Sequence, residues 1–227
     1  MKRINPLIIM MVLTAIMISV SAVCFHQPFI RILPLYISLV VSFLQSRVNR
    51  FAPLLGGLNC ILYAGVYVFY KLYGMAAYSF FVSFPLQIIT FIRWNRRPYG
   101  ESTVLKRMNK RAVIITAGCF ALAWLAVSFL LSLTDSTQSL LDSTVSLTGV
   151  LENTLLMLSF SEYTYITVST AFFNTALHIS MIIEGNMEQV AFFVYDIYRV
   201  TCSSIAVKRA KKILSELSAL KQSEGAE

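Results

Sequence analysis

Charged residues are scarce in this chain of 227 residues, of which 13% are charged and 57% are hydrophobic. Histidine is rarer still, because the chain contains only His26 and His178. The sequence also has no Gly-rich phosphate loop, HExxH motif or paired-glutamate protease pattern. A membrane-bound protease or acyltransferase needs catalytic His, Asp or Glu side chains clustered near one face, and two distant histidines argue against it. We therefore predict that the chain is not an enzyme and has no catalytic residue, cofactor or metal site.

The four cysteines also lack a pattern that would indicate cross-links or metal ligands. They lie within apolar stretches without CxxC or Cys/His spacing, at Cys24, Cys60, Cys119 and Cys202. Free thiols that pack as small hydrophobic side chains are the expected state.

What the chain does contain is long apolar runs separated by short basic clusters. Sixteen of the nineteen Lys and Arg residues lie in four clusters, at 2–3, 47–50, 93–111 and 208–221. Each interval between clusters has room for two membrane crossings, and apolar runs of this length cross a bilayer as helices. Because basic flanks stay in the cytoplasm, the pattern predicts a multi-pass protein of the cell (inner) membrane with both termini cytoplasmic.

The predicted fold class is all-α, with about eight transmembrane helices. Their expected ranges are 6–25, 29–46, 52–71, 75–95, 111–133, 143–160, 163–184 and 188–208. The first run is long for a signal peptide, so we expect it to remain as an extra helix. The expected domains are that N-terminal helix (1–27), a first three-helix bundle (28–95), a basic loop with a linking helix (96–135), a second three-helix bundle (136–210) and a cytoplasmic tail (211–227).

The net charge of +8 is compatible with nucleic-acid binding, but its distribution is not. The basic residues flank spans and are not interleaved with aromatic residues on one polar face. We expect no nucleic-acid partner, and contact with the lipid bilayer, through anionic headgroups, is the simpler interpretation of the loop 93–111.

Two stretches of the chain are similar to each other. The helix at 52–71 contains Leu-Asn-Cys-Ile-Leu-Tyr and the helix at 163–184 contains Phe-Asn-Thr-Ala-Leu-His, and each leads through an outer glycine into an aromatic-rich helix with a basic end. Three crossings reverse the chain direction, so two parallel three-helix units need a linking helix, and 111–133 is in that position. The pattern predicts a 3+1+3 parallel repeat, a plan of transporters that hold substrate near the membrane midplane.

Polar side chains inside spans are costly and indicate a cavity or a helix contact. The repeat pairs Asn59 with Asn174, and each precedes a ring residue, Tyr63 or His178, by four positions on one helix face. For the two asparagines, interhelical packing and solute binding both remain open. The other in-span candidates are Tyr67, Gln87, Glu152, Asn153, Tyr195, Asp196 and Arg199.

Two of these positions carry further expectations. Pro85 stands two residues before Gln87 in mid-helix and predicts a kink, which is either a gate or purely structural. Asp196 and Arg199 are three apart on one helix and could neutralise each other, either as a structural pair, which we favour, or as a pair that acts in gating.

The stretch Leu55-Gly56-Gly57-Leu58-Asn59-Cys60-Ile61-Leu62-Tyr63-Ala64, continued by Leu72-Tyr73-Gly74 and Phe84-Pro85-Leu86-Gln87, resembles the PnuC family of vitamin transporters. The segment 142–149, Glu162 and the last two helices resemble the second half of that family, so the likeness covers about 30–212. It implies a SWEET-like fold, homotrimers and facilitated diffusion of a vitamin such as nicotinamide riboside, thiamine or riboflavin. It also implies that a cytoplasmic kinase phosphorylates and so traps the imported vitamin.

The chain departs from that family at an aromatic clamp. Nicotinamide riboside transporters carry Trp after the glutamate that opens the seventh helix, where this chain has Thr164 and Thr167. Met75 and Ser79 stand where Asp and Gln are expected, and His178 replaces a common Tyr.

We predict a facilitator for a small aromatic vitamin or nucleoside-like solute, with nicotinamide riboside first, that works by alternating access without ATP hydrolysis and with trapping by a kinase. A thiamine or riboflavin transporter of the same family and a non-transporting vitamin-binding membrane subunit are the alternatives. The predicted binding residues are Asn59, Tyr63, Gln87, Asn153, Asn174 and His178, with Pro85 as a hinge. The amides would hydrogen-bond the solute, and the two ring residues would stack against it.

Overall fold

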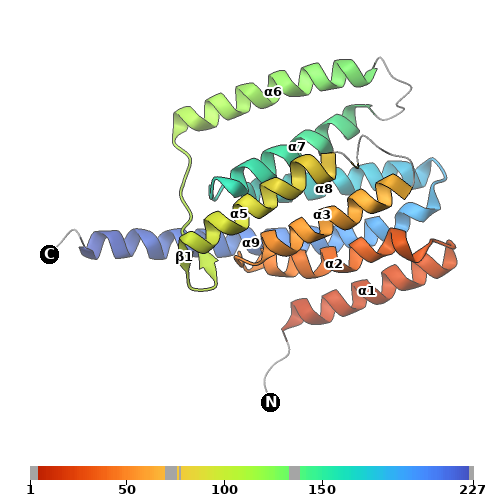
Figure 1. Ribbon diagram of the computed structural model, residues 1–227, viewed down its shortest axis with the longest axis horizontal. Helices are drawn as coiled ribbons and strands as arrows, with labels where there is room; N and C mark the ends of the chain where they lie inside the picture. The colour runs from red at the N-terminus through yellow and green to blue at the C-terminus, as the bar shows by residue number, and fades with distance from the viewer. Residues whose placement is uncertain (1–4, 70–75, 77, 133–138, 225–227) are drawn as a thin grey trace.

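The computed structural model of the chain describes residues 5–69, 76, 78–132 and 139–224, and these are almost entirely helical (Figure 1). The elements are α1 (Pro6–Cys24), α2 (Phe29–Ser46), α3 (Ala52–Phe69), the π-helical η1 (Tyr78–Ser83), α5 (Phe84–Arg96), β1 (Pro98–Tyr99), β2 (Ser102–Thr103), α6 (Lys110–Ser132), α7 (Ser139–Met157), α8 (Tyr163–Ile183), the 3₁₀-helical η2 (Met187–Gln189) and α9 (Val190–Glu224).

The eight predicted helices are all found, close to their expected positions. For α2 the agreement is complete, because Pro28 sets the extended entry to the helix and Val48, at a left-handed φ of 53°, follows its end. Length and composition alone make α1, α2, α6, α8 and the run η2–α9 long and apolar enough to cross a membrane, and α3 adds a shorter apolar segment. The predicted outer turn 72–74, Met75 and the cluster 2–3 lie outside the described residues.

The helix expected at 75–95 is built differently from the prediction. Pro85 does not kink an α-helix from within, because it is the second residue of α5 and follows the π-helical turn of η1. Proline lacks the backbone N–H that would donate a hydrogen bond to the carbonyl one turn earlier in an α-helix, and its ring crowds that same carbonyl. The wider π turn accommodates both effects, and such turns are frequent at functional sites.

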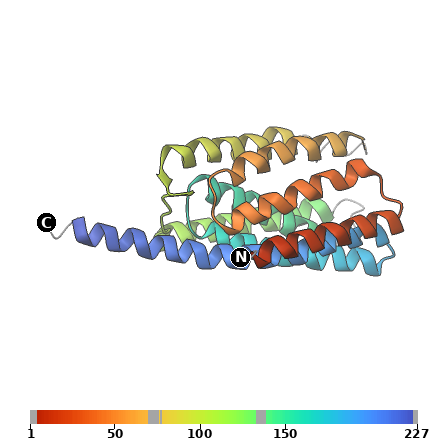
Figure 2. The same ribbon diagram turned by 90° about the horizontal axis from the view of Figure 1, so that it is seen from below.

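Six of the helices close into a ring. Each packs against the next in the order α2, α3, α5, α7, α8, α9, and α9 returns to α2. The helix α1 packs outside this ring against α9 and α2, whereas α6 packs against α7 and stands apart at the top of Figure 1 (compare Figure 2). The ring therefore has two seams between the first three helices and the last three, α2 with α9 and α5 with α7.

One end of the ring carries a small hairpin and the described parts of the predicted basic clusters, and we call it the basic end. In the hairpin Pro98 pairs with Thr103 and Tyr99 with Ser102. A buried cluster closes the ring here, and its members are Val48, Trp94, Leu105, Leu155, Leu156, Tyr163, Ala210 and Ile213. The indole Nε1 of Trp94 also donates a 3.2 Å hydrogen bond to the Leu156 carbonyl across the α5–α7 seam. Contacts from all parts of the ring thus meet at this end.

Candidate functional site

A pair of amide side chains crosses the α5–α7 seam inside the ring. Nε2 of Gln87 on α5 donates a 2.7 Å hydrogen bond to Oδ1 of Asn153 on α7. Gly56 on α3 makes room for this pair, because a Cβ atom at that position would lie 3.2 Å from Oε1 of Gln87. The two residues, predicted from different halves of the sequence, are therefore in direct contact.

A third amide lies on the neighbouring helix. Nδ2 of Asn59 on α3 donates a 2.8 Å hydrogen bond to Oγ of Ser38 on α2, and both side chains are buried. Asn59 is three residues beyond Gly56 and so near the same helix face as the glycine that contacts Gln87.

Two of these amides keep an oxygen without a donor. Oδ1 of Asn59 and Oε1 of Gln87 are buried, and neither accepts a hydrogen bond from the described residues. A buried acceptor without a partner costs about 1–3 kcal/mol, and natural proteins leave few of them. Two such oxygens near one another indicate a site that a solute with N–H or O–H donors would complete.

Beside the amides lies a buried ion pair. Nη2 of Arg199 on α9 is 3.3 Å from Oε2 of Glu152 on α7, and the two side chains are 20% and 9% exposed. The carboxylate of Glu152 also lies against the side chains of Thr167 and Thr170 on α8. The charges of α7 and α9 are thus compensated between helices, and Glu152 directly precedes Asn153 in the chain.

Asp196 and Arg199 do not form the direct ion pair that the sequence suggested, although the charge of Asp196 still acts on Arg199. Arg199 pairs with Glu152, whereas Oδ2 of Asp196 lies 2.5 Å from Nδ1 of His178 on α8. His178 and Asp196 lie on the neighbouring helices α8 and α9, whereas Glu152 and Arg199 reach each other from α7 and α9, the two helices that flank α8 in the ring. These interhelical partners replace the direct local pair at spacing three.

Two tyrosines complete the cluster around Arg199. Tyr63 on α3 and Tyr195 on α9 both lie near its guanidinium. The hydroxyl of Tyr195 is 3.0 Å from that of Ser42 on α2. Polar side chains from α2, α3, α7 and α9 therefore meet around one cation, and the contact of Tyr63 with a solute stays a prediction.

The second asparagine of the predicted repeat behaves differently from the first. Nδ2 of Asn174 donates a 2.9 Å hydrogen bond to the Thr170 carbonyl of its own helix. His178, one turn further, packs its ring against Phe192 with 5.5 Å between centroids. Both side chains are half-buried, and their contact with a solute stays a prediction.

Sequence reasoning missed the hydroxyl groups that support the site. Ser38, Ser42 and Ser46 are all buried on α2, and their spacing of four places them on one face. That spacing was the signal available in the sequence. Among the described residues no group of three or more His, Cys, Asp or Glu side chains is placed to hold a metal ion.

Comparison with known proteins agrees with this arrangement. The family model described as "Nicotinamide mononucleotide transporter" matches residues 28–201, from the turn before α2 into α9. The chain belongs to this transporter family. A solved structure described as the vitamin B3 transporter PnuC aligns with a TM-score of 0.72 over 92% of each chain, at 14% sequence identity. No curated protein matches the chain.

The predicted resemblance to the PnuC family is thereby confirmed, and so is the prediction that the protein is not an enzyme. The chain is a multi-pass membrane protein of a transporter family, and the structural likeness shows a shared fold over 92% of the chain. Thr164 and Thr167, which were predicted to stand at the position of the aromatic clamp, are both buried on α8, and Thr167 contacts Glu152.

Proposed function

We propose that this protein moves a small aromatic vitamin across the membrane, with nicotinamide riboside as its preferred solute. The observation that carries the proposal is the pair of buried oxygens, Oδ1 of Asn59 and Oε1 of Gln87, that lack donors among the described residues. A carboxamide NH₂ and ribose hydroxyls supply such donors. Binding then replaces two unfavourable buried acceptors with hydrogen bonds, which gives the solute affinity and orientation.

The remaining polar groups hold the solute from the other side. Asn153 accepts a hydrogen bond from Gln87 across the α5–α7 seam, and Tyr63, near Arg199, offers a ring for stacking. Asn174 and His178 lie on α8, in the same group of three helices as Asn153. In this proposal the Asn174 amide forms a hydrogen bond with the solute, and the His178 imidazole stacks against it.

The charge of the site favours a nucleoside over a nucleotide. Arg199 is paired with Glu152, and His178 is paired with Asp196. Among these described residues there is therefore no unpaired cation that could bind a phosphate group. A mononucleotide would bring a phosphate group of about −1.5 to −2 charges beside two carboxylates. Nicotinamide riboside lacks that phosphate, so it needs no unpaired cation in the site.

Transport would follow from movement at the two seams. One seam joins α2 to α9 and the other joins α5 to α7, and these two contacts support the proposal of a parallel 3+1+3 repeat of SWEET-like type. The two groups would rock about the site, with the π turn before Pro85 as the hinge. In this conformation the hydrophobic cluster at the basic end closes one path, so alternating access needs that cluster to open.

The setting of the transporter is part of the same proposal. The basic end faces the cytoplasm of a cell that carries the protein in its inner membrane, with both termini inside, because basic flanks stay on that side. The protein works as a homotrimer and without ATP hydrolysis, and a cytoplasmic kinase phosphorylates the incoming vitamin and so prevents its return.

Binding to the purified full-length protein in nanodiscs tests the solute. Titration calorimetry with nicotinamide riboside, nicotinamide mononucleotide, thiamine and riboflavin should give saturable binding of the first alone. Asn59→Leu should weaken that binding about 5- to 150-fold, whereas Asn95→Leu, at an exposed position in α5, should leave it unchanged. Binding of thiamine or riboflavin instead would reassign the solute, and tighter binding of the mononucleotide would overturn the charge argument.

Uptake into proteoliposomes separates a transporter from a binding subunit. Labelled nicotinamide riboside should equilibrate across the membrane, and it should accumulate only when a riboside kinase and ATP are enclosed. Binding without uptake would favour the non-transporting subunit, and accumulation without the kinase would contradict facilitated diffusion.

A further inference from the structure

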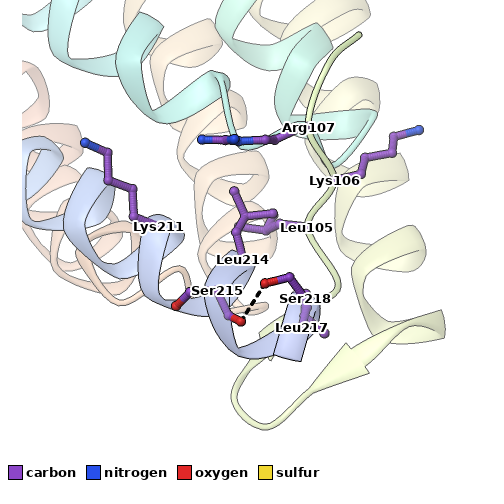
Figure 3. A pocket seen from close by; sticks show the side chains of 8 residues that line it. All are labelled: Leu105, Lys106, Arg107, Lys211, Leu214, Ser215, Leu217 and Ser218. Atoms are coloured by element: carbon purple, nitrogen blue, oxygen red, sulfur yellow. Dashed lines mark hydrogen bonds between the residues drawn. The ribbon is translucent and has the colours of Figure 1, made fainter. Parts of the chain in front are cut away.

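A groove outside the ring's polar centre opens at the basic end. It has a volume of about 580 Å³ and lies between the segment before α6 and the part of α9 that extends beyond the ring (Figure 3). Its lining residues are Leu105, Lys106, Arg107, Lys211, Leu214, Ser215, Leu217 and Ser218. Figure 3 shows that Lys106, Arg107 and Lys211 come from two segments far apart in the sequence.

The three cations of the groove have no acidic partner within the described part of the chain. Nζ of Lys106 lies 4.4 Å from the ring centroid of Phe160, and Nζ of Lys211 lies 5.7 Å from that of Tyr165. Arg107 is exposed. These aromatic contacts hold the two lysines over apolar surface without neutralising them.

The nearby carboxylates are engaged elsewhere. Glu162 accepts hydrogen bonds from the Met108 amide at 3.2 Å and from the Ser161 hydroxyl at 3.2 Å. Glu216 accepts a hydrogen bond from Tyr99 and lies 3.8 Å from Lys212. The groove therefore keeps a net positive charge, which the exposed neighbours Lys208 and Arg209 increase.

The floor of the groove is apolar and continues into a surface that faces the bilayer. Leu105 is buried, and Leu214 and Leu217 are half-buried beneath the cations. Tyr165, whose ring lies under Lys211, begins a line of exposed side chains on α8 that includes Phe172 and Ile179 at intervals of seven. Intervals of seven keep residues on one helix face, so this line runs along the membrane-spanning part of α8 from the groove.

We propose that this groove binds the headgroup of an anionic phospholipid, with its acyl chains along the exposed face of α8. A phosphate group placed between Arg107 and Lys211 meets two unpaired cations at the membrane surface, and Lys106, which points to the opposite side of its segment, adds a third positive charge nearby (Figure 3). The line that begins at Tyr165 supplies apolar contact for the chains. A free anion would use the first feature and not the second, so the combination identifies a lipid.

Native mass spectrometry of the purified full-length protein tests the proposal with phosphatidylglycerol and phosphatidylcholine at equal concentration. The wild type should retain phosphatidylglycerol at least about tenfold more strongly. Each cation near a headgroup contributes about fivefold, so K106Q/R107Q/K211Q should weaken retention about a hundredfold. The variant K106R/R107K/K211R keeps the charge and should retain the lipid.

A matched control changes three cations at the same end of the molecule. R93Q/R96Q/R97Q removes exposed charges from the end of α5 and should alter retention less than about threefold. An equal loss in this variant would mean that general surface charge holds the lipid, and the proposal would fail. Equal retention of the two lipids by the wild type would overturn it without any variant. Displacement of phosphatidylglycerol by inorganic phosphate would show a site for the anion alone, which also contradicts the proposal.

Discussion

The two groups of three helices that form the ring supply different chemistry to its centre. The group α2, α3 and α5 contributes neutral side chains, among them Asn59 and Gln87 with their unpaired oxygens. The group α7, α8 and α9 contributes ionisable ones, Glu152 with Arg199 and Asp196 with His178. Similar sequence patterns in the two halves thus lead to one half that offers hydrogen-bond acceptors and another whose charges satisfy each other.

The largest effect is expected from breaking the charge balance of the second group. Glu152→Leu leaves Arg199 buried without its carboxylate, and an uncompensated charge at this depth costs about 3 kcal/mol. The double variant E152L/R199L removes both charges and should recover most of that loss. Unfolding midpoints in detergent measure both, with exposed Glu101→Gln as control. Equal midpoints for the single and the double variant would show that the pair is not coupled.

The next prediction compares Asn59 with Asn174, the two asparagines that the predicted repeat pairs. Asn59→Leu removes an unpaired acceptor and should weaken solute binding by about 1–3 kcal/mol, or about 5- to 150-fold. Asn174→Leu removes an amide that already bonds its own helix, so its effect should be smaller. Uptake of nicotinamide riboside into proteoliposomes gives the comparison. Full uptake by both folded variants would remove these residues from the site.

A smaller effect comes from the glycine that gives Gln87 its space. Gly56→Ala places a methyl group 3.2 Å from Oε1 of Gln87, so the amide must shift and solute affinity should fall several-fold. Gly65→Ala on the same helix meets nothing within 4 Å and serves as the matched control. The two variants should unfold at similar temperatures, and a loss of affinity in G65A equal to that in G56A would contradict this role for Gly56.

The smallest effect concerns the hairpin and the end of α9. The hydroxyl of Tyr99 donates to Glu216, and this hydrogen bond raises the pKa of Tyr99 above its usual value. A raised pKa in the folded state means that the contact is fully present below the ordinary value of about 10 and is lost as the pH rises through the folded one. The protection of amides in the last turns of α9, measured relative to their intrinsic exchange rate at each pH, should therefore fall at alkaline pH in the wild type, whereas Tyr99→Phe should show the lower protection already at neutral pH. Identical exchange in both proteins would show that Tyr99 does not hold the helix.

The sequence predicted those parts of the fold that depend on local composition. Apolar runs between basic clusters located the helices, because backbone groups in a bilayer must bond within their own segment. The hairpin at 98–103 and the π turn before Pro85 were not foreseen, since each spans few residues and lacks a periodic pattern. The partner of Arg199 was also mispredicted, because chain order does not show that α7 and α9 bring Glu152 and Arg199 together. Gln87 and Asn153, which the sequence singled out as polar side chains inside spans, lie in direct contact, whereas the role of Asn59, Gln87 and Asn153 in binding stays a prediction.

The pairing of Glu152 with Arg199 has a consequence for energetics across a charged membrane. One elementary charge that crosses 100 mV changes its energy by about 2.3 kcal/mol. The two opposite charges lie 3.3 Å apart, so a group of helices that carries both of them gains no net charge from the pair when it moves. The membrane potential then acts on the charge of the transported solute and not on this ion pair. A cationic vitamin is drawn toward a negative interior, whereas a neutral one is distributed by concentration alone.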